Sequence, residues 1–337
     1  MGLKELKTQL KDGKLAPCYV FHGEEAYLRE HYTRELIKAV YPEDDSELMV
    51  LRGKGLTPDG LLDAIESISM LGESKLVIVK DLDIGKPPAN LKDTLERLTV
   101  PDGVILLFTY TDPAYKPDKR TKSYKNIEKL ANIVGFERQR EQDLISWIAR
   151  RFGAHGKQIS GQEANYLIFL CGTSMHNLAQ EVDKIAAFAD NPTISRADID
   201  AVASPVVETV VFALTDELTA GRYDKAAARL NELLNAREEP IALLALLGKQ
   251  LRGVYAAKLA LERRGGNLPP GKLVMDIMGY RSEYPARKLL DAARRLPLAW
   301  CRQAVILACE CDRRLKTSSI DKQDALPLLL AKLAMGK

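Results

Sequence analysis

Two spacings of apolar residues alternate along the first 140 positions of the chain. Short runs rich in Val, Ile and Leu, such as residues 75–80 and 104–110, predict strands that are buried on both faces. Between the runs, apolar residues recur every three or four positions, which predicts amphipathic helices. The predicted strands are residues 16–22, 48–51, 75–80, 104–110 and 133–136, and the predicted helices are residues 3–12, 25–40, 58–69, 91–98 and 125–131. This alternation is typical of a mostly parallel sheet between two layers of helices.

The strand pattern stops after residue 140, and every later segment has helical spacing. Ser160, Ser174 and Ser195 stand where N-caps are expected, and Gly172 stands where a helix should end. Longer helices are predicted at residues 209–219, 224–235, 240–263, 271–278, 285–296, 299–316 and 324–335. The sequence therefore predicts an α/β plus all-α chain. Its three predicted domains are a parallel-sheet domain at 1–140, a small helical bundle at 141–205 and a larger helical domain at 206–337.

The composition is that of an ordinary globular protein, with 337 residues of which 46% are hydrophobic and 28% are charged. The first 14 residues are charged throughout, so we expect no secretory signal. No run approaches the ~18 apolar residues of a membrane span, so we expect no membrane association and a cytoplasmic location. The net charge is only +3, so any contact with nucleic acid must be local or shared with other chains.

The turn after the first predicted strand lies where a nucleotide-binding P-loop would lie. The pattern G-x-x-x-x-G-K-[ST] follows a buried strand and wraps phosphates with backbone N–H groups. Counting from Gly23, the second glycine is replaced by Leu28. The lysine position holds Arg29, and the hydroxyl position that would bind Mg²⁺ holds Glu30. The sequence therefore predicts a degenerate loop that binds no nucleotide, and we expect no cofactor.

Two acidic residues, Glu24 and Glu25, lie inside this turn. We expect them to face the positive end of the following helix, an interaction worth about 0.3–1 kcal/mol each. The alternative is a strand–turn–helix corner with no nucleotide-binding ancestry. Asp81 and Asp83 follow another strand, at a position that resembles the metal-binding carboxylate of ATPases. Without a P-loop, the simpler interpretation is that they are turn residues.

Other catalytic and metal-binding patterns do not occur. The four histidines lie in separate segments without the spacing of metal ligands, and G-x-S-x-G is absent. The five cysteines form no C-x-x-C pair and are expected to be reduced thiols in the core. We therefore expect no catalytic residue, no metal site and no catalysis by this chain itself.

Met70 and Leu71 stand at the end of the predicted helix 58–69 and are followed by a glycine and a polar turn. Such a pair either packs against the end of the helix or projects into solvent. A projecting apolar pair marks a site for binding another protein.

Several segments, in this order, resemble the delta subunit of the bacterial DNA polymerase III clamp loader. The segments are P-C-Y-V-F-H-G-E-E-A-Y-L-R-E (17–30), S-M-L-G-E-S-K-L-V-I-V-K-D (69–81), W-I-A-R-R-F (147–152), N-L-A-Q-E-V-D-K-I-A-A-F (177–188), E-T-V-V-F-A-L-T-D-E-L (208–218) and E-E-P-I-A-L-L-A-L-L-G-K-Q-L-R (238–252). The order of domains is also typical of AAA+-type proteins. Each motif is loose, but their order and spacing together are specific.

This resemblance implies an AAA+-like domain, a helical lid and a helical collar. It implies that Met70 and Leu71 insert into a pocket of the sliding clamp and help to open the ring, although the family more often has Leu-Phe there. It further implies no bound ATP, assembly with other clamp-loader subunits into a hetero-pentamer through the C-terminal helices, and contact with primer–template DNA as part of that complex.

A basic cluster with interleaved tyrosines lies at residues 115–125 and includes Lys119, Arg120 and Lys122. These three residues are candidates for DNA contact, and a solvated loop is the alternative. Two other functions stay open at this stage. One is a P-loop-like ATPase with an atypical nucleotide site, and the other is a stand-alone DNA-binding module, which the low net charge disfavours.

Overall fold

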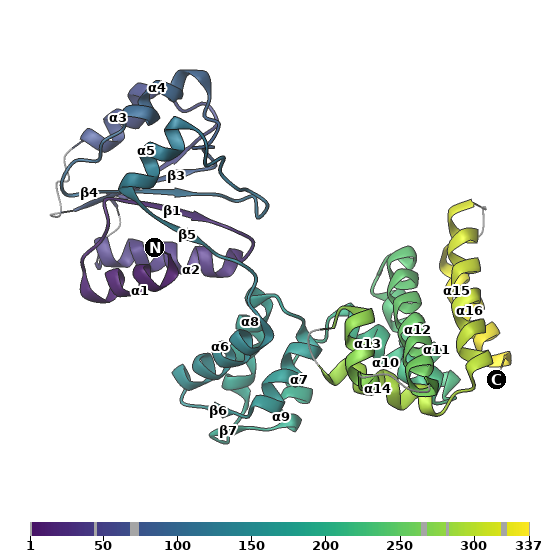
Figure 1. The fold of residues 1–337 in the computed structure, drawn as a ribbon. Helices are drawn as coiled ribbons and strands as arrows, with labels where there is room; N and C mark the ends of the chain where they lie inside the picture. Colours follow the sequence, from purple (N-terminus) through teal and green to yellow (C-terminus); the bar gives the residue numbers. More distant parts are fainter. Residues whose placement is uncertain are drawn as a thin grey trace. The chain divides into compact units, whose positions relative to one another are not determined.

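The structure is a computed structural model that describes residues 2–43, 46–67, 74–263, 268–280, 283–317 and 322–336. The chain divides into two compact units, residues 1–139 and residues 140–337 (Figure 1). Each unit has its own core of buried apolar side chains and is described by itself.

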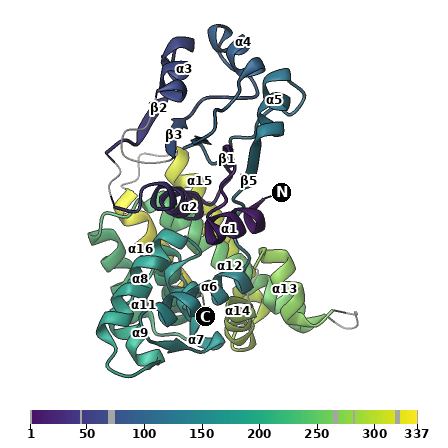
Figure 2. The same ribbon diagram turned by 90° about the vertical axis from the view of Figure 1, so that its left-hand side faces the viewer.

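The first unit is a parallel sheet covered on both faces. Its described strands are β1 (Cys18–His22), β2 (Met49–Arg52), β3 (Lys75–Lys80), β4 (Val104–Thr109) and β5 (Ala131–Gly135). They pair in the order β2-β3-β4-β1-β5, and every pairing is parallel. The described helices are α1 (Leu3–Asp12), α2 (Ala26–Val40), α3 (Pro58–Glu66), α4 (Ala89–Arg97) and α5 (Lys122–Leu130). Figures 1 and 2 show α1 and α2 on one face of the sheet and α3, α4 and α5 on the other.

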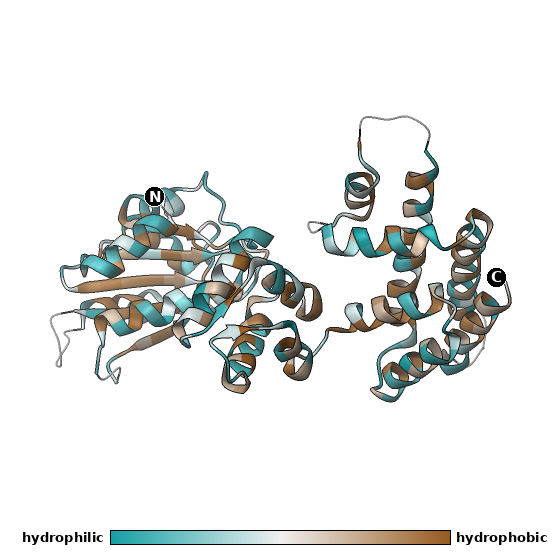
Figure 3. Cartoon of the chain, turned by 90° about the horizontal axis from the view of Figure 1, so that it is seen from below, coloured by the Kyte–Doolittle hydropathy of each residue, from teal (hydrophilic) through white to brown (hydrophobic). Residues whose placement is uncertain are grey.

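Burial on both faces explains the composition of the strands. The side chains of residues 18–21 and 105–108 are all buried, so neither strand alternates between apolar and polar residues. In Figure 3 the strands are almost uniformly hydrophobic, whereas the helices carry both colours. Because the strands are parallel, all their carboxyl ends meet at one edge of the sheet and all their amino ends meet at the other.

The second unit is helical, with one short strand pair. The described helices are α6 (Glu141–Ala154), α7 (Gly161–Cys171), α8 (Met175–Phe188), α9 (Arg196–Val202), α10 (Val207–Thr219), α11 (Tyr223–Asn235), α12 (Pro240–Glu262), α13 (Pro270–Met278), α14 (Glu283–Arg294), α15 (Leu298–Thr317) and α16 (Lys322–Met335). Side chains from α10 to α16 share one apolar core. Figures 1 and 2 both place α13 beside α14.

The predicted fold class, α/β plus all-α, is confirmed. The predicted caps at Ser160, Ser174 and Ser195 are also confirmed, since each hydroxyl accepts a hydrogen bond from a backbone N–H of the first helical turn. The prediction of no strand after residue 140 is wrong. β6 (Gln158–Ile159) and β7 (Thr193–Ile194) form a parallel pair, and two residues are too few to show a period in the sequence.

The prediction of a helix over residues 58–69 is too long. The backbone of α3 ends at Glu66, and Ser67 is extended with φ −63° and ψ 138°. Residues 68 and 69 lie outside the described residues. At its other end, α3 has the predicted N-cap, because the Thr57 hydroxyl accepts from the Gly60 N–H at 3.1 Å. Within the part of the chain that the structure describes, no helix is long and apolar enough to cross a membrane.

Asn126 on α5 joins two helices of the first unit. Its Nδ2 donates to the carbonyl oxygens of Leu95 and Leu98, both at 3.0 Å, at the C-terminal end of α4. The last carbonyl groups of a helix lack N–H donors from a following turn, so they need partners from elsewhere. One side chain therefore satisfies the end of a neighbouring helix.

We predict that Asn126→Ala destabilises the contact between α4 and α5 by about 1–3 kcal/mol, because two acceptors lose their donor. Faster hydrogen–deuterium exchange at the amides of α4 in the full chain would measure the loss. Lys125→Ala, at an exposed neighbouring position, is the control and should leave the exchange unchanged. Equal protection in Asn126→Ala and the unmodified chain would contradict the assignment.

Candidate functional site

The turn at Gly23 lies against the end of β5. Gly23 has φ +114°, and a Cβ placed there would lie 2.5 Å from the carbonyl oxygen of Phe136. The same oxygen accepts from the Glu25 N–H at 2.8 Å, and the Phe136 N–H donates to His22 O at 2.7 Å. A side chain at position 23 would break this close approach, so the glycine is required by packing as well as by backbone conformation.

Arg29 occupies the position of the P-loop lysine, and its side chain is 6% exposed. Its Nη1 donates to Gly23 O at 2.5 Å, so the guanidinium is bonded to the turn itself. Burial lowers the pKa of Arg29, and the charges of Glu30, Asp81 and Glu25 oppose this shift. The cation at this position is therefore held by groups of its own chain.

The other residues of the turn are placed as follows. Leu28 is buried on α2, where it packs as a core residue, and Glu30 is exposed. Glu24 forms an ion pair with Arg138, with 3.3 Å between Oε2 and Nε. Glu25 is the N-cap of α2, but its side chain makes no capping hydrogen bond. Glu24 thus has a partner from the chain beyond β5 that the sequence analysis did not predict.

Asp81 and Asp83 organise the turns after β3. Asp81 Oδ1 accepts from the N–H and the hydroxyl of Thr111 at 2.7 and 2.9 Å. Asp83 Oδ1 accepts from the backbone N–H groups of Gly85 and Lys86 and from the Tyr115 hydroxyl. Both carboxylates are thus turn residues, as the simpler interpretation of the sequence predicts, and they also bind donors from the chain that follows β4. Among the residues that the structure describes, no group of His, Cys, Asp or Glu could hold a metal ion.

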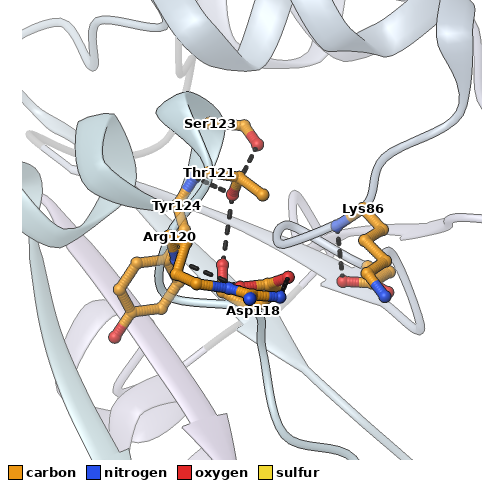
Figure 4. A network of polar contacts seen from close by, with 7 residues as sticks. Lys86, Asp118, Arg120, Thr121, Ser123 and Tyr124 are labelled. Carbon is orange, nitrogen blue, oxygen red and sulfur yellow. Dashed lines mark hydrogen bonds and ion pairs between the residues drawn. The ribbon is translucent and has the colours of Figure 1, made fainter.

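The basic loop before α5 has a fixed conformation. Arg120 donates to both carboxylate oxygens of Asp118, from Nε at 2.9 Å and from Nη2 at 2.8 Å (Figure 4). This pairing lowers the pKa of the Asp118 carboxyl well below its usual range. The loop also passes directly over Gly85, where an added Cβ would lie 2.4 Å from Asp118 N. Of the three candidates for DNA contact, Arg120 is therefore already engaged.

Positive charge is concentrated around this loop. Lys122, Lys125 and Lys129 are exposed and lie at spacings of three and four residues on α5, which places them on one face. Lys116 and Lys119 precede them and are also exposed. We call these five residues the lysine stripe. Residues 113–130 carry six cationic and two anionic side chains, a net charge of +4 against +3 for the whole chain.

The first two lysines of the stripe, Lys116 and Lys119, lie near the Gly23 turn at the carboxyl edge of the sheet. The pKa of His22, which precedes the turn, is lowered by burial and further by the charges of Lys119, Lys116 and Arg29. The structure thus brings together the predicted degenerate loop and Lys119, which the sequence presents as separate features. No sequence signal relates them, because strand order decides their proximity.

Met70 and Leu71, the candidates for clamp binding, lie outside the described residues. The described residues on either side are Ser67, after α3, and Ser74, before β3. Because Lys75 begins β3, this segment leads into the amino edge of the sheet. The edge is opposite to the one that carries the Gly23 turn.

The sheet order, the strand–turn–helix at Gly23 and the helices that follow define an AAA+-like chain. The family described as DNA polymerase III, delta subunit, matches residues 19–137, and the C-terminal domain of the same subunit matches residues 208–333. The chain belongs to the DNA polymerase III delta subunit family.

Individual proteins agree with this assignment. DNA polymerase III subunit delta of Bacillus subtilis is 25% identical over 338 residues, covering 96% of this chain and 94% of its own. The probable subunit delta of Aquifex aeolicus is 26% identical over 276 residues, covering 79% and 76%. The solved structure of the Bacillus subtilis DNA clamp loader delta protein has the same fold, with a TM-score of 0.58 and 21% identity over 98% of this chain and 99% of that one.

We predict that Gly23→Ala destabilises the first unit by about 1–3 kcal/mol, because the new methyl group would collide with the backbone at Phe136. Gly55→Ala is the matched control, since Gly55 also has a positive φ but has no atom near its added Cβ. Thermal unfolding of the full chain should show a larger shift for Gly23→Ala. Equal shifts would mean that backbone conformation alone requires the glycine.

Proposed function

We propose that this delta subunit binds the sliding clamp through Met70 and Leu71 and helps to open the ring for loading onto primed DNA. The observation that carries the proposal is the family match, whose two parts lie on both sides of the helical bundle and include the segment after α3. The Gly23 turn supports a subunit that does not use ATP itself, because Arg29 is bonded to the turn. Such a subunit acts in a multi-subunit complex with the clamp, in the bacterial cytoplasm.

The energy available from the apolar pair is sufficient for a specific contact. Burying two side chains of this size supplies about 3–6 kcal/mol before ordering costs are subtracted. A small apolar cluster of this kind is a typical hot spot of a protein interface.

We predict that the double substitution Met70→Ala/Leu71→Ala weakens clamp binding about 100-fold or more, which corresponds to the lower part of that range. Surface plasmon resonance with the full chain and the cognate clamp would measure the change. Val50→Ala removes another exposed apolar side chain from the same unit and is the control, with no change expected. Unchanged affinity of the double variant, with its assembly into the loader intact, would overturn the site.

We also propose that residues 206–337 form the collar that assembles with other loader subunits into a hetero-pentamer, and that residues 141–205 form the lid. Large apolar side chains that stay exposed on the collar helices support this assembly. They include Leu259, Ile277, Ile306 and Leu328. Burial of these exposed apolar side chains against the helices of partner subunits would lower the free energy of the chain.

An ATPase with an atypical nucleotide site is the first alternative. The geometry disfavours it, because two groups that could bind phosphate already have partners. The Glu25 N–H donates to the Phe136 carbonyl, and the Arg29 guanidinium donates to Gly23 O. Equilibrium dialysis of the full chain against labelled ATP would decide between the two functions. Micromolar binding would favour the ATPase.

We further propose that the lysine stripe contacts the phosphates of primer–template DNA within the assembled loader. The regular spacing on an exposed helix face and the fixed loop beside it support this role. Lys119 and Lys122 pair with no carboxylate among the described residues, whereas Arg120 is engaged by Asp118. We therefore assign the contact to the lysines rather than to Arg120. The small net charge of the whole chain disfavours the second alternative, a stand-alone DNA-binding module.

We predict that Lys119→Ala/Lys122→Ala weakens DNA binding by the reconstituted loader and lowers the slope of its salt dependence by about two, one for each lost phosphate contact. Fluorescence anisotropy over a series of salt concentrations would measure both. Lys4→Ala/Lys7→Ala removes two exposed lysines from α1, on the other face of the sheet, and should change neither. An unchanged slope for the first variant would exclude the stripe as a DNA contact.

A further inference from the structure

Lys75 is a buried cation at the start of β3. Its side chain is 5% exposed, and the next four residues of the strand are buried and apolar. An apolar residue would suit this position, since removing an ammonium group from water is costly. Burial lowers the pKa of Lys75, which agrees with an unfavourable setting for the charge. The position therefore calls for a reason other than packing.

The ammonium group binds the C-terminal end of α3. Nζ donates to Ala64 O at 2.7 Å, to Ser67 O at 3.3 Å and, at closer range, to Ser67 Oγ. Three donors thus meet three acceptors. Carbonyl groups at the negative end of α3 accept its hydrogen bonds. The negative charge of Glu47 also favours the charged form of Lys75 and acts against the lowering of its pKa by burial.

This bond fixes both sides of the segment that carries the apolar pair. Before the segment, Ser67 is the C-cap of α3, and its N–H donates to Asp63 O at 3.0 Å. After the segment, Lys75 N–H donates to Gly103 O at 2.7 Å, which ties the strand to the chain before β4. The side chain of Lys75 connects the two sides directly. The point where the chain leaves α3 is therefore set by a charged bond from β3.

We propose that Lys75 is a positioning residue for clamp binding, which sets the end of α3 from which the chain continues to Met70 and Leu71. The inference rests on the proposed function, since it assumes that the clamp binds this pair. Holding the base of a binding segment in place lowers the ordering cost that association must meet. Removing the bond raises that cost, and clamp affinity falls even though Lys75 itself is buried away from the clamp.

Lys75→Met tests this role, because it keeps the length and the apolar stem of the side chain and removes the donors. We expect clamp affinity of the folded full chain to fall about tenfold, the loss that charge-assisted hydrogen bonds of this kind produce. Tyr41→Phe is the matched control. The Tyr41 hydroxyl accepts from the Leu76 N–H at 3.0 Å, one residue along the same strand, but does not touch α3. This control should lower the unfolding temperature and leave clamp affinity unchanged.

A double-mutant cycle separates positioning from a general loss of stability. In the Met70→Ala/Leu71→Ala background, Lys75→Met should cause no further loss of affinity, because its effect acts through the pair. Should Lys75→Met fail to fold, Ser67→Ala takes its place, since it removes one of the three acceptors and should weaken binding about twofold to fivefold.

The outcomes are distinct. Unchanged affinity in Met70→Ala/Leu71→Ala would overturn the proposed clamp site itself. A loss in that variant with full affinity in Lys75→Met, or in Ser67→Ala if only that variant folds, would overturn the positioning role alone. An equal loss in Lys75→Met and Tyr41→Phe would show that any weakening of β3 lowers affinity, which would also overturn it.

Discussion

The strands of the first unit all run in one direction, and this constraint places the other features of the unit. Parallel strands must return through helices, so the chain leaves the sheet at the carboxyl edge and re-enters at the amino edge. The Gly23 turn and the first lysines of the stripe, Lys116 and Lys119, therefore lie at the carboxyl edge. The segment between α3 and β3 leads into the amino edge. The two binding sites proposed for the clamp and for DNA therefore lie toward opposite edges of the sheet.

Local rules explain most of what the sequence predicts correctly. Caps such as Ser160 and Ser195 depend on residues three positions apart, and buried parallel strands depend on short apolar runs. The replaced P-loop positions are also local, since Leu28, Arg29 and Glu30 follow Gly23 at fixed distances along the chain. The departure from the P-loop pattern is therefore visible in the sequence itself.

The features that the sequence did not predict depend on contacts between distant residues. Position 75 looks like an ordinary strand residue, and its partners at 64 and 67 become visible only when β3 lies beside the end of α3. Arg138 meets Glu24 because β5 pairs with β1. The same holds for Phe136 and Gly23. Lys75 could have been questioned from the sequence, since a charge at the start of a buried strand is unusual.

The bond between Arg29 and the Gly23 carbonyl separates this turn from the ATP cycle that controls a nucleotide switch. In a working nucleotide switch, the loop is filled and emptied as ATP is bound and spent, so its shape reports the stage of the cycle. Here the guanidinium of Arg29 donates to a backbone carbonyl of its own chain, an acceptor that is present whether or not a nucleotide is bound. The hydrogen bonds of the turn are satisfied without a ligand, so its conformation does not depend on the stage of an ATP cycle. In the proposed clamp loader, any conformational change timed by ATP would therefore start in another subunit.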